Sequence, residues 1–125
     1  SGEPVLSGKC TESCQYYAFF TDIATPELYP ELWETLLADF GPERKQTKKW
    51  ERIPFSNAFI GNYLRLELLY RYRLYDKVTD NIKGYFEMMA DTTGTLWEND
   101  TPHASCNHGF ASHVIYWLCG IFGKK

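Results

Sequence analysis

The sequence has no apolar run long enough to cross a bilayer. The longest such stretch, residues 113–122, is well short of the roughly 20 residues that a membrane-spanning helix needs. It also has no excess of charge of either sign, because 13 basic and 16 acidic residues give a net charge of −3, and the only basic cluster is residues 44–49. We therefore expect a soluble chain with neither a nucleic acid nor a membrane as partner.

Cysteines are also few, and their even number permits two disulfides without forming the dense framework of a small secreted scaffold. The four are Cys10, Cys14, Cys106 and Cys119. The opening Ser1-Gly-Glu-Pro lacks the basic start and apolar run of a signal peptide, and it resembles the start of a processed or engineered fragment. The compartment stays open, with a periplasmic or secreted location favoured over a cytoplasmic one.

The sequence is rich in apolar and aromatic residues. Hydrophobic residues make up 44% of the chain and aromatic residues 17%, which predicts a folded domain rather than a disordered segment. With 125 residues, the chain is long enough for one domain at most, which would span residues 1–125. Aromatic side chains beyond the needs of a core can bind sugar rings, although any single one is more often a core residue. No repeated motif indicates a solenoid.

Hydrophobic periodicity predicts five helices and no strands. The first begins at Thr11 as N-cap and runs to residue 24. Thr25-Pro26-Glu27 is the start signal of the second helix, which ends at Gly41. Its regular part is expected to begin near Tyr29, because Pro30 must lie in the first turn. The others are expected from residues 56 to 73, from Asp76 as N-cap to residue 90, and from 111 to 122.

This order of helices predicts an all-α fold of antiparallel helical hairpins. The 56–73 helix is apolar on nearly every side, so we expect it to be covered on two faces. Together with the 111–122 helix it offers more apolar surface than five helices can cover. We therefore expect further helical layers in a larger parent protein, of which this chain is the C-terminal part.

Two long connections join these helices. Residues 41–55 include the basic run from Arg44 to Lys49, which is expected to be a solvated loop. Residues 91–106 form a longer irregular loop, and long loops within helical domains are often functional. Around this second loop gather polar and aromatic residues that can carry chemistry: Trp97, Glu98, Asp100, His103, Asn107 and His108.

Glu98 directly follows a tryptophan in this loop. A carboxylate in such a place can act as a general base, activating a water that attacks a substrate stacked on the indole. The alternative is a solvated acidic side chain without a role.

The spacing of the histidines and cysteines fits a metal site or a catalytic thiol less well. His103, Cys106 and His108 are close in sequence, but their spacing to Cys10 and Cys14 matches no common zinc finger. Cys106 and His108 are two residues apart and rarely face one another as a nucleophile and its base would. We expect no metal and no cofactor.

Several segments of the chain resemble one known family. Thr95-Leu96-Trp97-Glu98 and the downstream Asn107-His108 are similar to the Trp-Glu loop of the bacterial alpha-L-rhamnosidases, glycoside hydrolases built as a barrel of six helical hairpins. The Cys-Gln-Tyr-Tyr-Ala-Phe-Phe stretch of residues 14–20, the Pro-Phe-Ser-Asn-Ala-Phe stretch of 54–59 and the Gly-Tyr-Phe-Glu-Met-Met stretch of 84–89 also suit that family's last hairpins. The resemblance thus covers essentially the whole chain.

The resemblance implies an inverting hydrolysis of terminal alpha-L-rhamnose with Glu98 as general base. Inversion needs a second carboxyl group as general acid, about 6.5–9.5 Å away, and the family's acidic motif for it has no counterpart here. Trp97 is expected to stack on the sugar, and Asn107 and His108 to contact its hydroxyls, with His103 as a further candidate outside the matched motifs. The implied partners are a rhamnose-containing glycan or glycoside and the remainder of the parent catalytic domain.

Two other interpretations stay open. The chain is either a helical interaction domain without catalytic function, or part of a six-hairpin enzyme for another sugar, such as a glucosidase or a trehalase, since one fold hosts many specificities.

Overall fold

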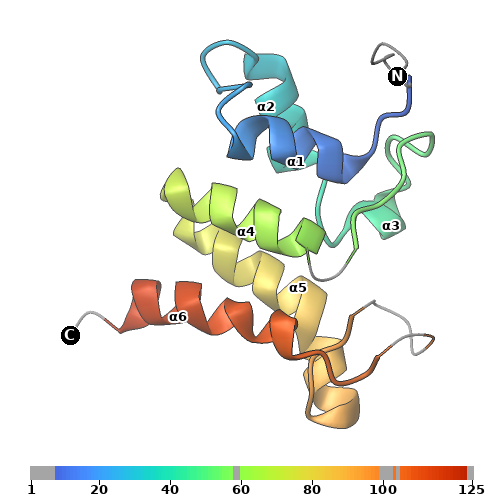
Figure 1. The fold of residues 1–125 in the computed structure, drawn as a ribbon, viewed down its shortest axis with the longest axis vertical. Helices are drawn as coiled ribbons and strands as arrows, with labels where there is room; N and C mark the ends of the chain where they lie inside the picture. The colour runs from blue at the N-terminus through green and yellow to red at the C-terminus, as the bar shows by residue number, and fades with distance from the viewer. Residues whose placement is uncertain (1–7, 58–59, 99–102, 104, 124–125) are drawn as a thin grey trace, which may run out of the picture.

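The computed structural model describes residues 8–57, 60–98, 103 and 105–123. Within these residues the chain is all-helical and contains no strand. The elements, in chain order, are α1 (Glu12–Phe20), α2 (Pro30–Ala38), α3 (Arg44–Thr47), α4 (Ile60–Arg71), α5 (Tyr75–Thr93), the 3₁₀ helix η1 (Gly109–His113) and α6 (Val114–Phe122). Figure 1 shows α4 in the middle, with α1 and α2 on one side and α5 and α6 on the other.

Helix α4 divides the hydrophobic core into two clusters. Leu64 and Leu68, four residues apart and therefore on one helix face, join the side chains of α1 and α2. Leu66 and Leu69 occupy the opposite face and join the side chains of α5, α6 and the segment after α5. All four leucines are buried. The prediction that this helix is covered on two faces is confirmed.

The starts of the first two helices follow the sequence signals. Thr11 caps α1, and its Oγ1 accepts the backbone N–H of Cys14 at 3.2 Å. Pro30 lies in the first turn of α2 after Tyr29 as N-cap, as predicted. Helix α1 ends at Phe20 instead of residue 24, because the chain turns at Asp22, which has a φ of 58°.

Two local predictions were wrong. Asp76 is not an N-cap: Leu74 holds that position, and Asp76 lies inside the first turn of α5, where the helix dipole favours an acidic side chain. The basic run of residues 44–49 is not simply a solvated loop. It contains the short helix α3, and the side chain of Arg44 is fully buried beneath it.

Not all of the apolar surface is covered within the described part of the chain. On α6, Ile115, Tyr116 and Phe122 are exposed, while Val114 and Trp117 on its inner face are buried. None of the described helices combines the length and hydropathy needed to cross a membrane.

Candidate functional site

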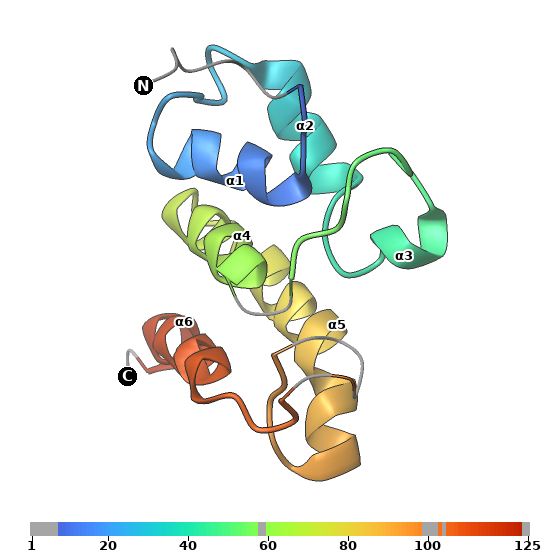
Figure 2. The ribbon, with the colours of Figure 1, turned by 45° about the vertical axis from the view of Figure 1, so that its right-hand side comes forward.

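The helices alternate in direction, so that several loops lie along one side of the molecule (Figure 1). The N-terminal ends of α1, α4 and α6 lie toward the same side as the C-terminal end of α5, as both views of the ribbon show (Figures 1 and 2). The segment after α5, which carries Glu98, leaves from this end. The fold therefore places the predicted catalytic segment beside the start of α6.

Backbone hydrogen bonds join the two halves of this loop. The N–H of Glu98 donates to the carbonyl oxygen of Ser105 at 2.9 Å, and the N–H of His108 donates to that of Leu96 at 2.8 Å. The hydroxyl of Thr95 donates to the carbonyl oxygen of Cys106. The Thr95–Glu98 segment and the Asn107–His108 segment, which are nine or more residues apart in sequence, are thus held side by side.

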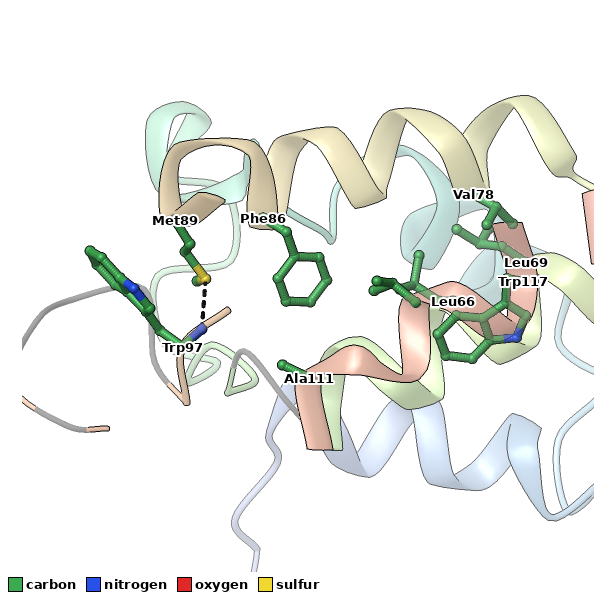
Figure 3. Close-up of a cluster of buried hydrophobic side chains, with 9 residues drawn as sticks. Leu66, Leu69, Val78, Phe86, Met89, Trp97, Ala111 and Trp117 are labelled. Carbon is green, nitrogen blue, oxygen red and sulfur yellow. Dashed lines mark hydrogen bonds between the residues drawn. The ribbon is translucent and has the colours of Figure 1, made fainter. Parts of the chain in front are cut away.

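Trp97 anchors this loop to the core. Its indole N–H donates to Thr93 Oγ1 at 2.8 Å, and its backbone N–H points to the sulfur of Met89 at 3.4 Å. Figure 3 shows this second contact and the indole beside the Met89 side chain. Only 4% of Trp97 is exposed. In this arrangement the indole is a core residue without a free face, which does not fit the prediction that it stacks on a sugar ring.

The other predicted residues lie nearer the surface. Glu98 and His108 are half-buried on the two paired segments, whereas His103 and Asn107 are exposed. Asn107 belongs to a tight turn in which the hydroxyl of Ser105 donates to the Asn107 carbonyl oxygen at 3.0 Å. The backbone pairing thus places Glu98 on a segment that lies beside the segment of Asn107 and His108. Asp100 lies outside the described residues.

A second group of polar residues is fully buried and was missed by sequence reasoning. Nη1 of Arg44 lies 2.6 Å from Oε2 of Glu12, and both side chains are almost completely inaccessible. The other carboxylate oxygen of Glu12 accepts from the hydroxyl of Tyr16 and from the backbone N–H of Gly41. Since every oxygen of Glu12 is already bonded, this carboxylate serves the fold rather than a substrate.

Arg65 extends this group into the centre of the molecule. Its Nε donates to Asn81 Oδ1 and its Nη1 to the carbonyl oxygen of Leu36, both at 2.6 Å. Nη1 also lies 3.5 Å from the hydroxyl of Tyr16. The network therefore ties α1, α2, α4 and α5 together. Its signal in the sequence was a single arginine among the leucines of a very apolar helix, because a charge at such a position is buried and must be paired.

The described residues contain no group of three or more histidine, cysteine or acidic side chains placed to hold a metal ion. Cys10 and Cys14 instead accept hydrogen bonds from their neighbours Gln15 and Thr11. Comparison with known proteins identifies no family model, no curated protein and no solved structure that matches the chain.

Proposed function

We propose that the chain is part of an inverting glycoside hydrolase that removes terminal alpha-L-rhamnose, with Glu98 as the general base. The observation that carries the proposal is the pairing of the loop's two halves, in which Glu98 donates to Ser105 and His108 donates to Leu96. The two motifs that resemble the rhamnosidases therefore lie together, although the sequence separates them.

The environment of Glu98 suits this role. Its backbone is held by the buried Trp97 before it and by the hydrogen bond from its own N–H to Ser105, while its side chain is only half-buried. A general base needs such a combination of a rigid attachment and access to water. With the indole of Trp97 buried, we assign that residue the positioning of Glu98, and the sugar contacts to Asn107, His108 and, from the turn, His103.

The proposed architecture of the parent enzyme is a toroid of six helical hairpins. The alternating directions of the helices, with several loops along one side of the molecule, support it (Figure 1). The exposed apolar side chains of α6 supply a face on which a further helix of the toroid would pack. The general acid is then contributed by another hairpin of the parent chain, across the sugar from Glu98.

Hydrolysis of an aryl alpha-L-rhamnoside by the full parent chain tests this proposal. Glu98→Gln keeps the size of the side chain and removes its basicity, so we expect a loss of rate of several orders of magnitude with unchanged helicity. Glu87→Gln, at an exposed position of α5, is the matched control and should keep full activity. Equal rates in wild type and Glu98→Gln would remove Glu98 from the mechanism.

The exposed face of α6 also supports a second candidate function, a helical domain that binds a protein partner through Ile115, Tyr116 and Phe122. The two functions respond differently to the same variants. If partner binding is the function, Glu98→Gln is harmless and Tyr116→Ser weakens the complex. If the parent hydrolyses other glycosides but not rhamnosides, the six-hairpin architecture stands and the sugar specificity is corrected.

A further inference from the structure

A cavity of about 170 Å³ is lined by none of the described residues of the Glu98 loop. It is partly open to solvent and is lined by the first turn of α1, the segment around Pro42, the first turn of α4 and the middle of α5. Six of the side chains that line it are Glu12, Lys45, Phe55, Asn62, Tyr85 and Met89. A single buried water needs only about 10–15 Å³ of such space, so the cavity is large enough for a small organic molecule.

Asn62 is the decisive residue of this cavity. Only 1% of it is exposed, and neither its amide nitrogen nor its amide oxygen finds a hydrogen-bond partner within the described part of the chain. Leaving the two polar groups of a buried amide unpaired destabilises the fold. The Asn62 amide offers two donors and an acceptor, and a buried side chain with these groups unpaired indicates a site for a polar molecule.

Tyr85 adds a second unpaired group. Its hydroxyl is buried near the hydroxyl of Tyr16, with which it forms no hydrogen bond of normal geometry. Burial raises the pKa of Tyr85 far above its ordinary range, so the hydroxyl stays protonated and can donate. Asn62 comes from α4 and Tyr85 from α5, and they line the same cavity from two sides.

Two charged side chains, Glu12 and Lys45, line the cavity, and both already have partners: Lys45 Nζ lies 5.5 Å from the ring centroid of Phe55. Glu12 is already neutralised by Arg44, and the guanidinium of Arg44 lies 4.5 Å from the ring centroid of Phe55. The side chains of Met88 and Met89 are apolar. What remains for a ligand is a neutral amide, a neutral phenol and apolar contact, a combination that suits a molecule with hydroxyl groups on a carbon frame.

We propose that this cavity binds a small neutral polyol, of monosaccharide size or smaller, through Asn62 and Tyr85. The site is distinct from the one proposed around Glu98 and does not depend on it. The two are neighbours, because Met89 lines the cavity and its sulfur also faces the backbone N–H of Trp97.

Nuclear magnetic resonance of the isotope-labelled 125-residue chain tests the site directly. L-Rhamnose and glycerol serve as polyol probes and sulfate as the charged counter-probe, each titrated while the side-chain amide signals of Asn62 are followed. We expect at least one polyol to shift these signals saturably and sulfate to leave them in place. No saturable shift with either polyol, or a shift with sulfate alone, overturns the proposal.

Variants separate this site from the rest of the molecule. Asn62→Leu keeps the size of the side chain and should abolish the shifts of the backbone amides of Gly84 and Met89, while Tyr85→Phe should weaken binding several-fold. Thr79→Val removes a hydroxyl from α5 away from the cavity and should bind like wild type. If Asn62→Leu does not fold, Tyr85→Phe and the wild-type Asn62 signals decide the question. Binding that survives both cavity substitutions contradicts the assignment.

Glu98→Gln completes the test. We expect it to leave the polyol titration unchanged, whatever it does to hydrolysis. If it abolishes the titration instead, the polyol binds in the Glu98 loop, and the cavity is not the site.

Discussion

Arg44 and Glu12 are 32 residues apart in the chain and form a buried ion pair with 2.6 Å between Nη1 and Oε2. The pair connects the start of α1 to α3. The other donors of Arg44 bind the backbone oxygens of Lys49, Trp50 and Ile53. One guanidinium therefore holds residues 49–53 of the connection between α2 and α4 against the first helix.

Arg44→Met should destabilise the fold strongly. Methionine replaces most of the volume but leaves the Glu12 carboxylate buried beside only neutral donors, and breaking one partner of a buried pair costs about 3–5 kcal/mol. The free energy of unfolding, measured in urea, gives the size of the loss. Lys48→Met is the matched control in the same basic run; because Lys48 is exposed, we expect a change within about 0.5 kcal/mol. Equal effects of both substitutions would mean that Arg44 is not paired in solution.

Trp97 should behave as a core residue rather than as a surface aromatic. Trp97→Ala removes a large buried side chain and its bond to Thr93, and truncations of this kind cost about 3–5 kcal/mol. Trp50→Ala is the control, since Trp50 is half exposed and its indole only donates to Asp39. Thermal or urea unfolding of the two variants gives the comparison. A small loss of stability for Trp97→Ala would show that the indole is not buried in solution, and its predicted role in sugar stacking would then stand.

Local sequence signals predicted the helices well because caps and periodicity act over a few residues. Thr11 and Pro30 mark helix starts by their own backbone chemistry, and the leucines of α4 show their two buried faces in sequence. The Asp76 prediction failed for a related reason: an acidic residue is favoured both at an N-cap and in a first turn, and only the tertiary path of the chain decides which it occupies.

The interior polar contacts were not predictable in the same way. In sequence, Arg44 looks like its solvated neighbours Lys45 and Lys48, and its burial follows from the return of α3 onto α1. Asn62 likewise resembles an ordinary surface residue of a helix start. Trp97 illustrates the opposite case, because the motif suggested an exposed indole, and packing against Met89 buried it.

The stability of the chain should depend on His113 near neutral pH. Burial lowers the pKa of His113, against the opposing effect of its contact with the carbonyl oxygen of Phe110. The unfolded chain, with a histidine pKa of about 6.5, then binds more protons than the folded chain as the pH falls. Stability contributed by His113 is therefore complete above that value and is lost as the pH falls from about 6.5 toward the lowered folded pKa.

Urea unfolding between pH 7.5 and 5.5 measures this effect. His113→Phe keeps an aromatic ring among Tyr63, Phe86 and Trp117 and removes the titration, so its stability should fall less over this range than that of wild type. His103→Phe, at an exposed position, should follow the wild-type curve. Parallel curves for wild type and His113→Phe would contradict the coupling.

The 125-residue chain by itself should show negligible rhamnosidase activity, a prediction that rests on the proposed function. Inversion requires a second carboxyl group about 6.5–9.5 Å from the first to protonate the leaving oxygen. Glu12, the one acidic side chain that is deeply buried among the described residues, has its oxygens occupied by Arg44, Tyr16 and Gly41. The purified chain and the full parent chain, assayed side by side at equal folded concentration, give the comparison. Clear turnover by the 125 residues alone would show that the general acid lies within this chain, and substitution of each exposed acidic side chain would then identify it.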